Sequence, residues 1–259
     1  MSAFFTTEKG SISGLDFFTV KSPALKKRSD ACFYRPESIK KGVPLVILLH
    51  GVYGSNWSWA LKANVHKTLE KGIASGHIPP MLLAMPSDGH FQDGSGYLKH
   101  HEQDYEKWIT EDVISLAKEA YPEVNESSLI FLAGLSMGGY GALRLGAKHP
   151  SIFKAFSGLS SITKFEQHKS FLENIANLEK AATNQENVLE LLLQNKNSLR
   201  PFRFDCGKED SLYTANVKLH QELLEEDIPH DFYSYDGEHS WEYWAQNIEA
   251  TLRFFAKHI

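Results

Sequence analysis

The stretch LIFLAGLSMGGYGALRL, residues 129–145, places a short apolar run, a serine flanked by glycines and an amphipathic segment in direct succession. The apolar run predicts a buried strand, and the periodic segment after it predicts a helix. Between them, Gly134-Leu135-Ser136-Met137-Gly138 has the form G-x-S-x-G, in which a sharp strand-to-helix turn exposes the serine. A plainer interpretation is a glycine-rich junction that only allows close packing. The strand before the motif and the helix after it favour a nucleophilic Ser136.

The rest of the chain repeats this succession of short apolar runs and longer amphipathic segments. Repeated strand–helix units predict an α/β fold, with a mostly parallel central sheet and helices on both faces. An antiparallel pair, residues 15–20 and 31–34, is predicted before the first unit. The other predicted strands are residues 43–49, 81–85, 129–132, 153–159, 202–206 and 232–235, and the predicted helices are residues 57–71, 105–120, 137–148, 171–193, 212–226 and 241–258.

One segment, residues 161–199, departs from this alternation. It is richer in Asn, Gln, Glu and Lys and has helical patterns without a strand. A separate domain would need more residues than this. We therefore expect a small helical insertion over the sheet, within a single domain that comprises residues 1–259.

Composition excludes several classes of protein. The 259 residues carry 27 Lys and Arg against 32 Asp and Glu, a net charge of −5, which argues against binding to nucleic acid or an anionic membrane. No apolar run approaches the roughly 18 residues of a membrane span. The N-terminal sequence lacks the pattern of a signal peptide, so a cytoplasmic protein is expected. Cys32 and Cys206 are too few for a disulfide scaffold or a cysteine zinc site.

A nucleophilic serine needs a histidine base and a carboxylate that orients it, in the chain order Ser, Asp or Glu, His. Asp210 follows the strand at 202–206, and His239 follows the strand at 232–235, so both lie where parallel sheets place their chemistry. Asp210 could instead cap the next helix. Glu209 is the second choice of acid, and Asp205 falls inside the strand. We predict Ser136, Asp210 and His239 as the catalytic residues.

An oxyanion hole requires two N–H donors. The backbone N–H of Met137, next to the serine, is the expected first donor. The second should come from the loop His50-Gly51-Val52-Tyr53-Gly54 after the strand at 43–49, with Val52 preferred and Tyr53 next. An ordinary glycine turn is the alternative for this loop.

Several other residues are candidates for binding. Tyr53, Trp57 and Trp241 could line a substrate pocket or belong to the core. Residues 87–101 contain Asp and His side chains that could bind a metal, but their spacings match no known pattern of ligands. A loop that shapes the pocket is the preferred interpretation, and neither a metal nor a cofactor is expected. The potential ligands are Asp88, His90, Asp93, His100 and His101.

Five stretches together resemble one family along most of the chain: LVILLHGVYGSNWSW (45–59), AMPSDG (84–89), GLSMGGYGALRL (134–145), CGKEDSLY (206–213) and GEHSWEYW (237–244). The chain resembles the α/β-hydrolases of the putative esterase family, which includes tributyrin-type esterases, S-formylglutathione hydrolase (esterase D), feruloyl and acetylxylan esterases and mycolyltransferases. The resemblance implies an α/β-hydrolase fold, with the nucleophile at Ser136, the acid at Asp210 and the base at His239. It also implies oxyanion donors at Val52 and Met137.

The expected function is therefore that of a serine carboxylesterase that hydrolyses short-chain acyl esters through an acyl-enzyme. The short HGVYGS loop resembles the tributyrin-type enzymes most, and an early Asn- and Cys-rich stretch typical of S-formylglutathione hydrolases is absent. An S-formylglutathione hydrolase-like thioesterase, a feruloyl or acetyl carbohydrate esterase, an acyltransferase and a binding protein that keeps the fold are the alternatives. The expected partner is a small-molecule ester, and a homo-oligomer is compatible with the sequence.

Overall fold

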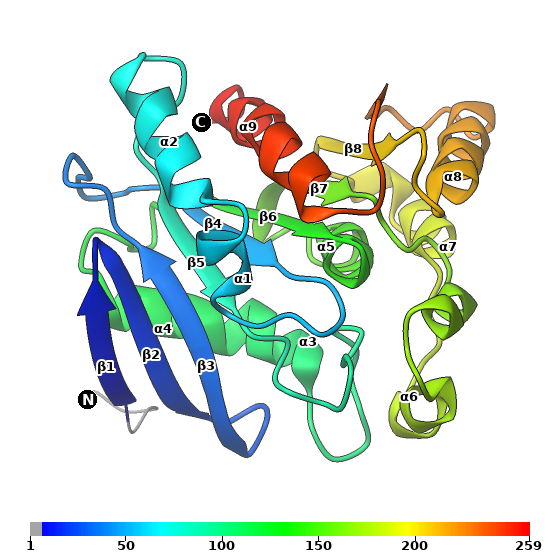
Figure 1. The fold of residues 1–259 in the computed structure, drawn as a ribbon, viewed down its shortest axis with the longest axis horizontal. Coiled ribbons are helices and arrows are strands. Elements are labelled where there is room, and N and C mark those ends of the chain that lie inside the picture. The colour runs from blue at the N-terminus through cyan, green and yellow to red at the C-terminus, as the bar shows by residue number, and fades with distance from the viewer. Residues whose placement is uncertain (1–6) are drawn as a thin grey trace.

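The computed structural model describes residues 7–259, which are organised around one nine-stranded sheet with the strand order β1-β2-β3-β5-β4-β6-β7-β8-β9 (Figure 1). Strands β1 to β3 and the β3–β5 pair are antiparallel, and the strands from β5 through β9 are parallel. The strands are β1 (Thr7–Ile12), β2 (Leu15–Ser22), β3 (Lys27–Tyr34), β4 (Leu45–Leu49), β5 (Leu82–Pro86), β6 (Ile130–Leu135), β7 (Phe153–Leu159), β8 (Phe202–Gly207) and β9 (Asp231–Tyr235).

Helices cover both faces of this sheet, as predicted (Figure 1). One apolar core packs α1, α2 and α9 against one face, and a second core packs α4, α5, α7 and α8 against the other. The helices are α1 (Ser58–Leu61), α2 (Val65–Ala74), α3 (Tyr105–Lys107), α4 (Val113–Ala120), α5 (Met137–Lys148), α6 (Ile175–Ala181), α7 (Val188–Gln194), α8 (Tyr213–Glu225) and α9 (Trp241–Ala256), with a π-helical turn η1 (Trp108–Asp112) and two 3-10 turns, η2 (Phe165–Ser170) and η3 (Lys196–Ser198).

Two predicted helices are wrong as continuous elements. The segment 57–71 divides into α1 and α2 because Asn64, with φ of 50°, adopts a left-handed conformation that ends the first helix. The segment 171–193 divides into α6 and α7, since the backbone at Ala182 is extended. Strand β1 was not predicted because its sequence, TEKGSI, is exposed throughout and has no apolar face.

The insertion at 161–199 consists of η2, α6, α7 and η3 and contains no sheet strand. Helix α7 packs against α5 and α8, and a two-residue bridge joins His100 to Ala182. The insertion is therefore folded onto the helix that follows Ser136. Within residues 7–259, none of the helices is both long and apolar enough to cross a bilayer.

Candidate active site

Ser136 occupies the turn between β6 and α5, and its backbone is strained, with φ of 54° and ψ of −118°. The glycines of the motif are required by close approach of backbone segments. A Cβ atom on Gly134 would lie 2.2 Å from the Gly138 carbonyl oxygen, and one on Gly138 would lie 2.4 Å from the Leu49 carbonyl oxygen. Any larger residue at either position would force the turn apart, so the glycines of the sequence pattern have a steric cause. Ser136 itself is buried, contrary to the expected exposure, and it lines a cavity rather than the outer surface.

The three residues predicted as catalytic lie within hydrogen-bond reach of one another. The Nε2 atom of His239 is 3.0 Å from Ser136 Oγ, and the Nδ1 atom of His239 is 2.8 Å from Asp210 Oδ2 and 3.0 Å from Asp210 Oδ1. They arrive from loops that follow three different parallel strands, β6, β8 and β9. An Nδ1–H that donates to Asp210 leaves Nε2 free to accept the serine proton.

The carboxylate of Asp210 is kept charged by its surroundings. Burial by itself would raise its pKa, but the hydrogen bond and charge of His239 and the hydrogen bond from the Leu212 N–H together lower that pKa below its ordinary value. The side chain is fully buried, whereas that of His239 is 20% exposed. Asp210 can therefore stabilise a positive charge that forms on the imidazole.

The alternative acids are engaged elsewhere. Glu209 is exposed, and its carboxylate accepts a hydrogen bond from the Gly237 N–H. Asp205 lies inside the sheet, where it forms an ion pair with Arg203 at 2.9 Å and accepts a hydrogen bond from the Tyr243 hydroxyl at 2.8 Å. Neither carboxylate contacts His239.

The loop after β4 lies directly against the serine turn. A Cβ atom on Gly51 would lie 3.2 Å from Ser136 Cβ, so the loop and the nucleophile are in contact. The backbone N–H groups of Val52 and Met137 donate no hydrogen bond within residues 7–259. Two unpaired N–H groups beside a nucleophile are what an oxyanion hole provides.

His50 holds this loop in place. Its Nε2 atom accepts a hydrogen bond from the Asp88 N–H at 2.9 Å, so its Nδ1–H donates to the Gly51 carbonyl at 2.6 Å. Burial lowers the pKa of His50 and keeps the ring neutral in this tautomer. The Gly51 carbonyl and the Val52 N–H belong to one planar peptide group and point in opposite directions. The bond from His50 therefore fixes the direction of the Val52 N–H.

A cavity of about 390 Å³ opens over Ser136 and His239. Its walls include Tyr53, Trp57 and Trp241, the three aromatic residues predicted to line a pocket. They also include Phe171 from the insertion and Trp244 from α9, which the sequence analysis did not identify. Trp244 is the second tryptophan of the W-x-x-W pattern after His239, a signal that could have identified it, whereas no local sequence pattern marks Phe171.

The model of a family described as "Putative esterase" matches residues 22–255. The chain belongs to this family. An acetyl esterase from Caldicellulosiruptor saccharolyticus is 24% identical to this esterase over 230 residues, which cover 81% of this chain and 82% of the relative.

Solved structures show the same fold. A ferulic acid esterase matches with a TM-score of 0.84 and 24% identity, over 95% of this chain and 97% of that chain. An S-formylglutathione hydrolase from Staphylococcus aureus, FrmB, matches with a TM-score of 0.78 and 20% identity, over 96% of this chain and 99% of that chain. The expected fold class and family are confirmed: this esterase is a hydrolase with the α/β-hydrolase fold.

The Asp- and His-rich loop at 87–101 supports the loop at 50–54, which forms part of the cavity wall. Asp88 accepts hydrogen bonds from the N–H groups of His90 and Ser95, and the Asp93 carbonyl accepts one from the Tyr53 N–H. His100 is buried, with its ring 4.5 Å from those of Phe91 and Tyr105. In the part of the chain that the structure describes, no three His, Cys, Asp or Glu residues are placed to hold a metal.

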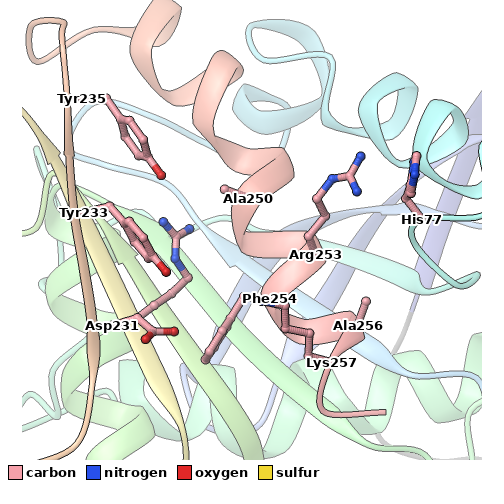
Figure 2. A pocket seen from close by; sticks show the side chains of 10 residues that line it. His77, Asp231, Tyr233, Tyr235, Ala250, Arg253, Phe254, Ala256 and Lys257 are labelled. Atoms are coloured by element: carbon pink, nitrogen blue, oxygen red, sulfur yellow. The ribbon is translucent and has the colours of Figure 1, made fainter.

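A second and larger cavity, of about 480 Å³, lies between β9 and α9 (Figure 2). Figure 2 shows Tyr233 and Tyr235 projecting from β9 toward the helix that carries Arg253. The stacked tyrosine rings have centroids 6.2 Å apart. No member of the Ser136, Asp210 and His239 group lines this cavity.

Proposed function

We propose that the chain is a serine carboxylesterase that hydrolyses short-chain acyl esters through an acyl-enzyme on Ser136. The observation that carries the proposal is the hydrogen-bonded series Asp210–His239–Ser136, with distances of 2.8 and 3.0 Å, at the floor of an aromatic cavity. Three such side chains on separate strand ends have no structural task that requires this order.

In the proposed reaction, His239 Nε2 accepts the proton of Ser136 Oγ while this oxygen forms a bond with the ester carbonyl carbon. The carbonyl π electrons move to its oxygen, and the N–H groups of Val52 and Met137 stabilise the resulting oxyanion. The tetrahedral intermediate collapses, the bond to the alcohol oxygen breaks, and His239 gives its proton to the leaving alcohol. A water molecule then gives a proton to His239 Nε2 while its oxygen forms a bond with the acyl carbon. The bond between that carbon and Ser136 Oγ breaks, the acid leaves, and His239 returns the proton to Ser136 Oγ.

Two features support a short acyl group. The cavity of about 390 Å³ is modest, and its walls are large aromatic side chains. The acetyl esterase relative, at 24% identity, is named for a two-carbon acyl group. A thioesterase or a feruloyl or acetyl carbohydrate esterase would use the same group of residues, so these activities belong in the same assay.

The test is hydrolysis of p-nitrophenyl esters from acetyl to decanoyl, with Ser136→Ala measured beside the wild type. We expect turnover that is highest for the shortest chains and that falls by at least about 10⁴-fold in the variant, while the melting temperature is retained. Near-unchanged turnover in purified Ser136→Ala would contradict the proposed nucleophile.

The other substrate classes are tested beside this panel. A thioester and a feruloyl ester, each assayed with both proteins, distinguish the alternatives. A maximum at decanoyl, or serine-dependent turnover of the thioester alone, would contradict short-chain carboxylesterase activity while leaving the nucleophile in place. A folded chain inactive on the whole panel and unreactive toward a fluorophosphonate would favour the binding-protein alternative.

A further inference from the structure

We propose that Phe171, contributed by the insertion, is a positioning residue for the catalytic base His239, and that the Tyr53 hydroxyl holds Phe171 in place. This inference rests on the proposed function, because it assigns a role relative to the proposed base. The proposal assigns a positioning role to the insertion and to the exposed Tyr53, which neither the G-x-S-x-G motif nor the fold class implies.

The first observation concerns the His239 ring. Its side chain is only 20% exposed, although it lies on a loop beyond the end of β9. Two aromatic rings from different parts of the chain cover it. The Phe171 ring lies over the imidazole with centroids 5.1 Å apart and an interplanar angle of 31°, and Trp244 of α9 meets it edge-on at 5.0 Å and 89°. Rotation of the imidazole away from Ser136 would require one of these rings to move.

The two rings differ in how they are supported. Trp244 stands on α9, in edge-to-face contact with Trp241, which in turn contacts Trp59 of α1. Phe171 lies just beyond the last residue of η2, in an irregular segment. Its placement therefore depends on bonds made by the segment itself rather than on a long helix.

Hydrogen bonds join this segment to the loop at 50–54, which contains Val52, and to the loop at 87–101. The Tyr53 hydroxyl donates to the Phe171 carbonyl at 2.7 Å, and the Glu173 N–H donates to Asp93 Oδ2 at 3.3 Å. The Asp93 carbonyl accepts a hydrogen bond from the Tyr53 N–H at 3.0 Å, which joins the two loops that make these contacts. Tyr53 reaches the insertion from a left-handed backbone, with φ of 57°, and its side chain is 61% exposed. A large ring in a strained conformation and open to solvent needs a reason, and the bond to the insertion supplies one.

Together these contacts connect the proposed oxyanion donor Val52 with the proposed base His239. The loop that contains Val52 also restrains, through Tyr53 and Phe171, the orientation of the imidazole whose Nε2 atom lies 3.0 Å from Ser136 Oγ. Because a proton transfer of this kind depends on distance and direction, a small displacement of His239 slows the attack of Ser136 on any electrophile, whatever its acyl chain.

The test uses four variants of the full chain: Tyr53→Phe, Phe171→Ala, both together, and Phe171→Tyr, which keeps the ring. Two rates are measured: labelling of Ser136 by an alkyl fluorophosphonate, which reports activation of the serine without an acyl pocket, and turnover of p-nitrophenyl acetate. Tyr233→Phe removes an exposed hydroxyl from the cavity in Figure 2 and is the matched control.

We expect Phe171→Ala to slow labelling and to lower kcat by about 10- to 30-fold, with KM changed by less than about twofold. Tyr53→Phe should lower both rates by about fivefold, and Phe171→Tyr should stay within about threefold of the wild type. The double variant should be no slower than Phe171→Ala, because the Tyr53 hydroxyl acts through Phe171. Tyr233→Phe should match the wild type.

Three outcomes would overturn the inference: wild-type labelling by Phe171→Ala, effects that add fully in the double variant, or a change confined to KM. If Phe171→Ala does not fold, Tyr53→Phe and Phe171→Tyr still decide, since wild-type rates in Tyr53→Phe would remove the role of its hydroxyl. Failure of the proposed function is distinct, because Ser136→Ala would then be labelled and active like the wild type.

Discussion

Two aromatic cavities of this esterase differ in whether their polar groups already have partners within the protein. The larger one, at about 480 Å³, lies between β9 and α9 (Figure 2). The smaller one, at about 390 Å³, is lined by Ser136. In the larger cavity, Arg203 is paired with Asp205 at 2.9 Å and Arg253 with Glu249 at 2.7 Å, so both arginines already have a carboxylate partner within the protein.

In the smaller cavity, polar groups converge on Ser136, and two of them have no hydrogen-bond partner within the described residues. The Ser136 hydroxyl has a base at 3.0 Å, and the N–H groups of Val52 and Met137 have no partner in residues 7–259. Volume and aromatic walls therefore do not distinguish a site from a surface hollow. Unsatisfied groups that converge on one point do, because a substrate can satisfy them as the reaction proceeds.

The strongest way to sharpen this comparison is Asp210→Asn, with Glu209→Gln as the matched control on the same loop. An amide at 210 removes the charge that stabilises the imidazolium and favours the wrong His239 tautomer, so kcat should fall by about 10³- to 10⁴-fold. Steady-state hydrolysis of p-nitrophenyl acetate measures it. Glu209→Gln should stay within about threefold, and an equal loss in both variants would contradict Asp210 as the acid.

Substitution of Arg203, which lines the larger cavity, should change the stability of the fold rather than the catalytic rate. Asp205 titrates at about 6 when folded, because burial raises its pKa more than Arg203 and Tyr243 lower it from the ordinary 3.8. The folded chain keeps a proton that the unfolded chain releases, so the contribution of Asp205 to the free energy of unfolding declines from pH 3.8 to about 6. Arg203→Met removes a group that lowers this pKa, so the decline should extend above pH 6.

We therefore expect Arg203→Met to lower the free energy of unfolding by about 4 kcal/mol at pH 8 and by clearly less at pH 5. Urea denaturation at the two pH values measures it. Arg253→Met, which removes an exposed ion pair, should change the free energy of unfolding by less than about 1 kcal/mol at either pH. The same loss at both pH values for Arg203→Met would contradict the role of Asp205.

A third experiment removes one of the unpaired donors. Val52→Pro lacks the backbone N–H and should lower kcat by about 10²- to 10³-fold, whereas Val52→Ala keeps that N–H and should retain most activity. Circular dichroism and the melting temperature check the fold of both variants. Equal activity of the two would show that Val52 donates nothing to the reaction.

The smallest expected effects test the larger cavity for a hidden part in catalysis. Tyr233→Ala should leave kcat/KM for p-nitrophenyl acetate within about twofold of the wild type, whereas Trp241→Ala, in the cavity of Ser136, should lower it by about tenfold. Each substitution removes one large aromatic wall. A fivefold loss in Tyr233→Ala would break the distinction between the two cavities.

Much of the architecture could be predicted locally. The fold class and family are confirmed, and the parallel strands lie within a few residues of their predicted bounds, because buried strands must be short, apolar runs. The three residues predicted as catalytic, Ser136, Asp210 and His239, lie within hydrogen-bond distance of one another. Parallel strands bring the loops at their C-terminal ends to one edge of the sheet, which is why this could be predicted. The continuous helix at 171–193 was wrong because helical periodicity in a polar segment does not reveal where the helix ends.

Local sequence patterns were sufficient to predict the family, the parallel strands, and the chemical groups that follow the ends of those strands. These features depend on residues that are near one another in the sequence. Gly134 and Gly138 are an example, because the tight turn around Ser136 leaves no room for a Cβ atom at either position. Three contacts became evident only from the folded chain: Phe171 lies over His239, the Tyr53 hydroxyl reaches the insertion, and His50 sets the direction of the Val52 N–H. These contacts join residues that are far apart in the chain or depend on a side-chain tautomer, so no local pattern encodes them.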